Sequence, residues 1–222
     1  MTHRTVLDVP DVTSYLIRFQ GWTEERFLQE APEDAFWEYE DGDVIVHSPV
    51  GTTHQRIVRF LTILIGTYVR FRGLGDVLTG PAVVRLRPGL DYEPDIFFVG
   101  ADQMNRLGET YLEGPPRWVV EVTSPSTRRY DLETKARNYE RYGVAEYWVI
   151  DPEGRVVVQH VSVGQRYRRR RVRRGRLESQ VAPGFWIDVG WLWQDPLPDE
   201  WTCLQSILGP SPAPLPHRPP GM

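Results

Sequence analysis

WVVEVTSPSTRRYDLETKARNYERYGVAEYWVID, residues 118–151, decides the fold of this chain. It opens and closes with short apolar runs, 118–122 and 147–150, and between them residues 131–142 carry apolar side chains at helical spacing and end at Gly143. Strands that are apolar on both faces are typical of the buried centre of a sheet. A strand, a helix and a second strand at this spacing predict a right-handed parallel crossover.

The chain before residue 118 reads as short strands around one long helix. Thr23 followed by two acids predicts a short capped helix over 23–28. Asp41-Gly42 is a dipeptide that supplies the positive φ of a tight hairpin. Apolar residues at helical spacing predict an amphipathic helix over 53–70, closed by Gly73. Strands are expected at 36–40, 44–47, 76–86, 95–99 and 156–161.

Length and composition indicate one domain, and the pattern of strands and helices makes it an α/β domain. With 222 residues, of which 41% are hydrophobic, the chain can bury one substantial core. We expect an N-terminal extension over 1–22, a folded domain over 23–208 and a disordered tail over 209–222. The tail contains six prolines, which favour an extended and poorly packed segment.

Cysteine usage and hydropathy predict a cytoplasmic protein with no membrane partner. The only cysteine is Cys203, which excludes an intramolecular disulfide and suits a reducing compartment. The first ten residues lack the apolar run of a signal peptide, and no window approaches the roughly 18 apolar residues of a membrane span.

The charge of the chain is unevenly distributed. Its net charge of −4 argues against a protein that coats nucleic acid by electrostatics alone. Residues 166–176, however, contain eight arginines and no acid. They indicate either a phosphate-binding patch, with Arg168, Arg170 and Arg173 as candidate nucleic-acid contacts, or a solvated hairpin with Gly175 at its tip.

Lys135 is the only lysine of the chain, against twenty-five arginines. Arginine stays protonated and is bulky, whereas an ammonium is compact and its pKa responds to burial and to neighbouring charges. The single lysine therefore suggests a position where an ammonium is required. The alternative is that Lys135 has no such role and lies on a solvated helix face by chance. Lys135 shares a helical stripe with Leu132, Tyr139 and Tyr142, so we expect it to face the sheet.

Two carboxylates stand where a core should be apolar. Glu121 lies inside its strand, and Asp95 precedes the apolar run 96–99. A buried carboxylate costs several kcal/mol unless it is paired or binds a metal. One interpretation is a divalent cation between the two acids. The other is a structural ion pair of Glu121 with Lys135, with Asp95 capping a turn.

These residues belong to motifs that closely resemble the Uma2 family, formerly a domain of unknown function, within the PD-(D/E)XK nuclease superfamily. The resemblance spans roughly residues 23–192, and its most specific part runs from Pro94 to Pro152. The motifs that carry it are Pro94-Asp95, the run Glu121 to Thr127, Asp131, Lys135, Tyr139, Gly143-Val144 and the run Glu146 to Pro152. Glu38 to Asp43, Ser48-Pro49 and His54 fit the same family upstream.

The resemblance implies a restriction endonuclease-like core, which is a mixed β-sheet flanked by helices, here with an added β-hairpin region. It also implies that Asp95, Glu121 and the backbone carbonyl of Val122 bind Mg²⁺ or Mn²⁺, cations that prefer hard oxygen ligands. The usual lysine two residues after the glutamate is Thr123 here. We infer that Lys135 supplies the ammonium from the following helix. The implied activity is metal-dependent endonucleolytic hydrolysis of DNA, and the resemblance also leads us to expect a homodimer.

Two further residues are candidates for the same site. Glu38 has two interpretations. It is an acidic group that binds the metal or accepts from metal-bound water, or it is a solvated strand residue. His54 is either a phosphate or water contact at the rim of the cleft or a satisfied structural histidine. Ser124, Ser126 and Thr127 are expected to organise the loop before the helix, and His47 and His160 to be strand and packing residues.

Three other functions compete with the nuclease. A non-catalytic module on the same fold would grip nucleic acid through the arginine-rich stretch without cleaving it. A glycosidase-like hydrolase would use Asp95 and Glu121 as acid and base, which leaves Lys135 without a task. An interaction protein would depend on aromatic side chains such as Trp191 and Trp193.

Overall fold

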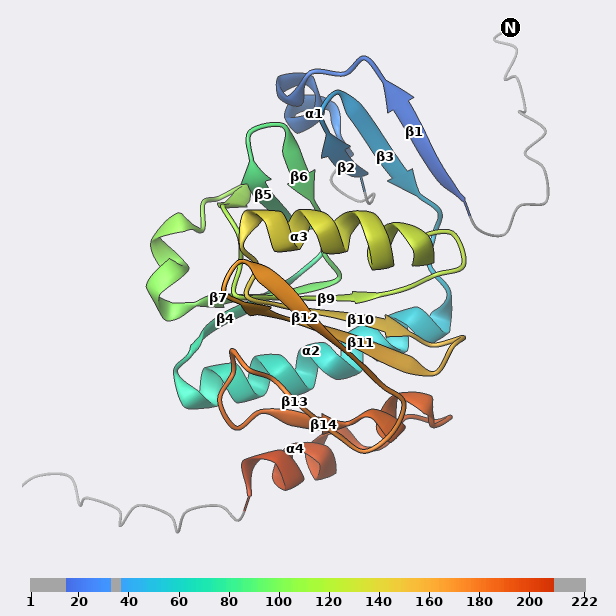
Figure 1. Cartoon of the computed structure of the whole chain (residues 1–222), viewed down its shortest axis with the longest axis vertical. Helices are drawn as coiled ribbons and strands as arrows, with labels where there is room; N and C mark the ends of the chain where they lie inside the picture. The colour runs from blue at the N-terminus through green and yellow to red at the C-terminus, as the bar shows by residue number, and fades with distance from the viewer. Residues whose placement is uncertain (1–14, 33–36, 210–222) are drawn as a thin grey trace, which may run out of the picture.

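The computed structural model describes residues 15–32 and 37–209, which form two six-stranded sheets, a small two-stranded sheet and helices between and around them (Figure 1). The central sheet has the order β12-β11-β10-β9-β7-β4, and the second sheet the order β1-β3-β2-β6-β5-β8. The fold is therefore the mixed α/β architecture that the sequence predicts.

The central sheet is built around the predicted crossover. Strands β9 (Trp118–Val122) and β10 (Glu146–Asp151) pair in parallel, with Glu121 beside Val149. The other neighbours pair antiparallel. These further strands are β4 (Gly75–Thr79), β7 (Ile96–Gly100), β11 (Val156–Val163) and β12 (Arg166–Val172).

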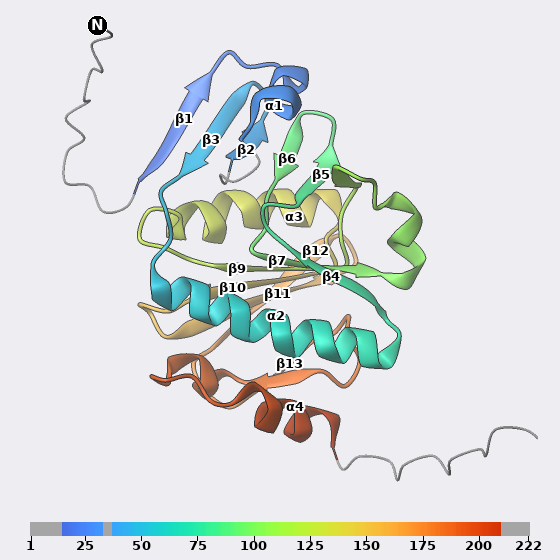
Figure 2. The same ribbon diagram turned by 180° about the vertical axis from the view of Figure 1, so that it is seen from behind.

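Helices cover both faces of the central sheet (Figures 1 and 2). The long helix α2 (Thr52–Arg72) packs against the even-numbered side chains of β9, such as Trp118 and Val120. The crossover helix covers the opposite face, where Val119 and Tyr139 share a core. It begins with a π-helical turn, η2 (Tyr130–Lys135), and continues as α3 (Ala136–Tyr142) up to Gly143, close to the predicted bounds. Because Glu121 alternates with Val120, its side chain points toward this second helix.

The second sheet brings the N-terminal hairpin over the crossover helix. Its strands are β1 (Leu16–Gln20), β2 (Trp37–Glu40), β3 (Asp43–His47), β5 (Val83–Arg87), β6 (Leu90–Tyr92) and β8 (Tyr111–Glu113). The turn between β2 and β3 is the predicted one, with φ of 48° at Asp41 and 100° at Gly42. Helix α1 (Glu24–Glu30) is capped as expected, because the Thr23 hydroxyl accepts from the amide of Arg26 at 3.2 Å. A 3-10 helix, η1 (Ala101–Arg106), follows β7.

Two sequence predictions about strands are wrong. Residues 76–86 form two strands in different sheets, because the chain turns at Gly80-Pro81, where the amide of Ala82 donates to the carbonyl of Thr79. Gly175 is not a hairpin tip. The hairpin turns after β11 at residues 164–165, and β12, which holds most of the arginine-rich stretch, pairs with β11 as the edge strand of the central sheet.

The C-terminal segment packs beneath α2. It comprises β13 (Arg176–Glu178), β14 (Trp186–Asp188), the 3-10 turn η3 (Val189–Trp193) and α4 (Glu200–Leu208). Leu177 and Phe185 of this segment share a core with Trp118 of the central sheet. The buried carboxylate of Glu146 also joins the two, because it accepts hydrogen bonds from Trp148, Gln159, Ser179 and the amide of Gln180.

The expected ends of the chain lie mostly outside the described residues. Within the expected extension over 1–22, residues 16–20 form β1 and pair with β3. The proline-rich tail from residue 210 onward is not described. None of the helices formed by residues 15–32 and 37–209 combines the length and the apolar character that a membrane span requires.

Candidate active site

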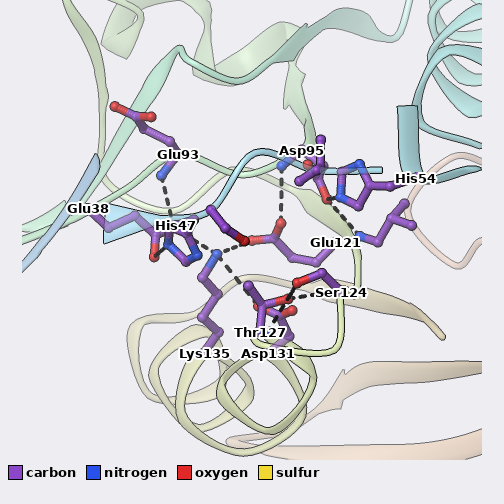
Figure 3. A pocket seen from close by; sticks show the side chains of 13 residues that line it. Glu38, His47, His54, Glu93, Asp95, Glu121, Ser124, Thr127, Asp131 and Lys135 are labelled. Carbon is purple, nitrogen blue, oxygen red and sulfur yellow. Dashed lines mark hydrogen bonds and ion pairs between the residues drawn. The ribbon is translucent and has the colours of Figure 1, made fainter. Parts of the chain in front are cut away.

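All five candidate catalytic side chains line one cavity (Figure 3). Asp95 and Glu121 come from the central sheet, Lys135 from η2, Glu38 from β2 of the second sheet and His54 from the first turn of α2. Segments separated by up to about a hundred residues in the chain thus meet where β9 ends and β7 begins.

Lys135 is held between two carboxylates. Its Nζ lies 2.7 Å from Oε1 of Glu38, 2.7 Å from Oε1 of Glu121 and 3.8 Å from Oδ1 of Asp131. Burial favours the neutral amine, but the charges of Glu121 and Glu38 outweigh it and raise the pKa of Lys135 well above its usual value. The ammonium is therefore permanently charged at neutral pH, and its position suits charge stabilisation rather than proton donation.

Glu121 is buried and fully hydrogen-bonded. Its Oε1 accepts from Lys135 and from the Tyr139 hydroxyl at 3.2 Å, and its Oε2 accepts from the backbone amide of Asp95 at 3.1 Å. Burial raises the pKa of Glu121 well above the ordinary value; Lys135 opposes this and the charge of Asp95 adds to it. The carboxylate therefore stands in surroundings with too little positive charge.

Asp95 is the most open acid of the predicted set, with 14% of its side chain exposed against 5% for Glu121. Its Oδ2 accepts from the backbone amide of Val122 at 2.7 Å and lies 3.1 Å from Nε2 of His54. Burial opposes the charged imidazole, but the hydrogen bond and charge of Asp95 raise the pKa of His54. This pairing sets the position of the Asp95 carboxylate.

Glu38 ties the second sheet to the site. Besides Lys135, it meets Nε2 of His47 at 3.1 Å and accepts from the backbone amide of Glu93 at 3.3 Å. Burial alone would raise its pKa, yet Lys135 and His47 together lower the pKa of Glu38 to about 2. Of the two interpretations of Glu38, a solvated strand residue is wrong, because only 1% of the residue is exposed.

Sequence reasoning missed His47, which it assigned to strand packing. Glu38 pairs with Ile45 across the β2–β3 hairpin, so His47 is its diagonal neighbour on the same face. That spacing about the Asp41-Gly42 turn was the signal that could have found it.

Two more buried acids line the cavity. Asp131 lies inside η2 and is buried. Burial raises the pKa of Asp131 to about 6. Glu93 accepts from the amide of Trp37 at 3.2 Å, and burial, with the charge of Glu38, raises its pKa to about 9. Nothing in the sequence pattern marks Glu93.

The loop before η2 has the structural role predicted for it. The amide of Ser124 donates to the Thr127 hydroxyl at 3.0 Å, and the amide of Thr127 donates to the Ser124 hydroxyl at 3.3 Å. Ser126 lies 3.0 Å from the same Ser124 oxygen. This closed network shapes the turn that carries the chain from Glu121 to Lys135.

The donor chemistry of the cavity suits a hard divalent cation. Five carboxyl groups, Glu38, Glu93, Asp95, Glu121 and Asp131, surround one ammonium and two imidazoles. Burial raises the pKa of Glu121, and the charges of the neighbouring acids add to that effect. Among the described residues no three side chains of His, Cys, Asp or Glu form a ready-made metal cluster. Two carboxylates and a backbone carbonyl nevertheless fit Mg²⁺, which usually keeps several waters.

The arginine candidates lie away from this cavity. Arg168 and Arg170 belong to β12, where they pair with Val161 and Gln159, and Arg173 follows the end of that strand. None of the three lines the cavity of Asp95.

The fold and the site define the class of this chain: a restriction endonuclease-like α/β protein, with a mixed sheet flanked by helices and acids gathered where its central strands end. A crystal structure described as a putative nuclease belonging to DUF820, from Anabaena variabilis, is similar, with a TM-score of 0.66. Sequence identity is 16%, over 78% of this chain and 97% of that chain, so this likeness concerns the fold. The chain belongs to the Uma2 family, described as "Putative restriction endonuclease", whose model matches residues 24–190. No match was found among curated proteins.

Proposed function

We propose that this protein is a metal-dependent endonuclease that hydrolyses phosphodiester bonds of DNA. The observation that carries the proposal is the position of Lys135. Its Nζ lies 2.7 Å from Oε1 of Glu38 and 2.7 Å from Oε1 of Glu121, in the cavity that Asp95 also lines. Membership of the Uma2 family, described as "Putative restriction endonuclease", supports the same reaction class.

Asp95, Glu121 and the backbone carbonyl of Val122 are the residues that would hold Mg²⁺ or Mn²⁺. The chemistry that a divalent ion would supply when bound there is polarisation of a phosphate oxygen and a lower pKa for a bound water. The carboxylates themselves set the place of that ion, since His54 and the amide of Val122 orient Asp95 while Lys135 and Tyr139 orient Glu121.

Lys135 acts on the attacking water and on the charge that develops at phosphorus. Its raised pKa keeps it charged, so it orients the water and stabilises negative charge in the transition state without giving up a proton. Glu38 holds the ammonium in place, and His47 holds Glu38. His54, at the rim, is positioned to orient Asp95 and to contact the phosphate or a water.

The test compares cleavage of plasmid and branched DNA, with Mg²⁺ or Mn²⁺, by the wild type, Asp95→Asn and Lys135→Ala. Each variant is expected to lose at least about a hundredfold in rate. Lys135→Arg separates charge from shape. We expect it to be as inactive as Lys135→Ala, because a forked guanidinium does not fit between Glu38 and Glu121.

The alternative function, a non-catalytic nucleic-acid-binding module, makes the opposite prediction. In that case the wild type would bind DNA without nicking it at any Mg²⁺ or Mn²⁺ concentration. Arg168, Arg170 and Arg173 are proposed as longer-range attractors of phosphate under either function. A homodimer and a cytoplasmic location stay predictions of the sequence.

A further inference from the structure

The site lies where strands of the central sheet end, and we call this end of the sheet the site edge. A groove lies along the site edge on each side of the site. One groove, of about 190 Å³, is lined by Arg56 of α2, by Pro152 and Arg155 of the β10–β11 turn and by Trp193; we call it the Arg155 groove. The other, of about 270 Å³, is lined by Arg59, Gln55 and Thr62 of α2, by Thr79 and Gly80 and by Asp95; we call it the Arg59 groove.

The Arg59 groove and the catalytic cavity share the side chain of Asp95. Thr79, at the end of β4, pairs with Ile96, the residue after Asp95. On the other side of the site, the β10–β11 turn follows directly from Asp151, one residue beyond Ile150, which pairs with Val122. The grooves therefore lie along one sheet edge, with the site between them and the N-terminal half of α2 beside all three.

The arginines along this edge are available to bind another anion. The Arg59 side chain is 69% exposed and its guanidinium lies 3.5 Å from Glu200. The Arg56 side chain is 61% exposed and its guanidinium lies 3.7 Å from Asp195. Pairs this long between solvated side chains contribute little, so a phosphate can replace the acid at small cost. Arg155 is exposed at the turn, and Arg173 donates to the carbonyl of Gly154 in the same turn.

We propose that one strand of the DNA lies along this edge, with phosphates on one side of the scissile bond contacted by Arg56 and Arg155 and those on the other side by Arg59. The inference rests on the proposed function, because it takes the Asp95 cavity as the point of cleavage. From β11 to β4 the edge crosses four strand spacings, about 19 Å, which accommodates several nucleotides. Of the three arginines predicted from the sequence to contact nucleic acid, Arg173 lies at this edge. Arg168 and Arg170 lie further from it, within β12.

The test is the affinity of the full chain for a short fluorescent DNA oligonucleotide, single-stranded and as a duplex, by anisotropy in EDTA so that no metal-dependent cleavage occurs. Arg59→Ala and Arg155→Ala are each expected to weaken binding about fivefold and to reduce the slope of log Kd against log salt by about 0.7 to 0.9. The matched control is Arg70→Ala, an exposed arginine about 16 Å further along α2, which is expected to change the affinity less than about twofold.

Glu200→Gln distinguishes a phosphate contact from a structural role of Arg59. If Arg59 serves only to hold α4, losing Glu200 should mimic losing Arg59; if Arg59 meets phosphate, freeing it should tighten binding. Absence of binding by the wild type, equal effects of the Arg59 and Arg70 variants, or weaker binding by Glu200→Gln would each overturn the proposed path. A wild type that binds through Arg59 but never cleaves with metal would sink the nuclease proposal and leave the path standing.

Discussion

At the scale of the residue, the main feature of the site is the balance between the charge of Lys135 and the charges of the acids around it. One buried ammonium faces three acids within 3.8 Å, and each of its two closest partners comes from a different sheet. The result is an asymmetric pair of carboxylates, because the pKa of Glu38 is lowered to about 2 while the pKa of Glu121 is raised. Glu38 is thus the permanent counter-ion of Lys135, and Glu121 is the acid that an added cation would stabilise.

Glu38→Gln tests this assignment through stability. The substitution removes one of two carboxylates at 2.7 Å from a buried ammonium, so we expect a loss of about 3 kcal/mol in the free energy of unfolding. Urea denaturation at neutral pH measures it. Glu30→Gln is the control, since it breaks only an exposed pair with Arg26 and should cost less than about 0.5 kcal/mol. Equal midpoints for the two variants would contradict the role of Glu38.

His160 predicts a pH dependence of stability away from the site. It is 5% exposed and stacks on Tyr147, with ring centroids 5.5 Å apart, and burial with the charge of Arg169 lowers its pKa to about 4. Because the folded state favours the neutral ring, its contribution is complete above the unfolded pKa of about 6.5 and is lost as the pH falls toward 4. The full effect is about 3 kcal/mol.

We therefore expect His160→Phe, which keeps an aromatic ring beside Tyr147, to flatten the loss of stability between pH 6.5 and pH 4. Denaturant unfolding of both proteins across that range is the measurement. The prediction fails if the two curves stay parallel as the pH falls.

At the scale of the element, the C-terminal segment shares an apolar core with the central sheet, and one buried anion joins the two by hydrogen bonds. The Glu146 carboxylate is 0% exposed and accepts from Trp148 at 2.6 Å, from Gln159 at 2.7 Å and from Ser179 at 2.8 Å. All these partners donate, and no cation is among them. The carboxylate therefore specifies how β10 meets the segment around β13.

Glu146→Gln replaces an acceptor with an amide whose NH₂ faces donors. We expect a loss of about 2 to 3 kcal/mol, concentrated in faster amide hydrogen exchange of β13, β14 and α4. Glu178→Gln, at an exposed pair with Arg176 in the same segment, should leave exchange unchanged. Uniformly faster exchange over the whole chain would argue against a local attachment.

At the scale of the whole molecule, the site exists only because two sheets pack on the crossover helix. Asp95 and Glu121 belong to one sheet, Glu38 and His47 to the other, and Lys135 to the turn between them (Figure 3). Ligand binding at such a junction should stabilise the entire fold, because a bound cation is lost on unfolding.

Mg²⁺ or Mn²⁺ is therefore expected to raise the melting temperature. At a hundred times Kd the gain is about 2.7 kcal/mol, and it should vanish in Asp95→Asn. Differential scanning calorimetry with metal and with EDTA measures it independently of DNA cleavage. Arg70→Ala is the control that should keep the full metal response, and a metal effect that persists in Asp95→Asn would place the cation elsewhere.

Most of the central fold was readable from the chain alone. The crossover, the long helix and the Asp41-Gly42 turn were correctly predicted, because apolar periodicity and turn chemistry are local signals. Residues 76–86 were predicted as one strand although Gly80-Pro81 interrupts them. The dipeptide marks a turn, but it does not reveal that the strands on its two sides belong to different sheets. The tip at Gly175 was misplaced for a related reason: a glycine marks a turn without saying which strands it joins.

For the site, the amino-acid order already singled out Asp95, Glu121 and Lys135, because a charge inside an apolar strand and a solitary lysine are visible without coordinates. Only the three-dimensional packing decided that Glu38 meets both Lys135 and His47, that Asp131 is buried beside Lys135 and that Glu93 faces the same cavity. The reason is physical. Whether a polar side chain is solvated or paired depends on which distant segment covers it, and long-range packing of two sheets leaves no periodic trace in the chain.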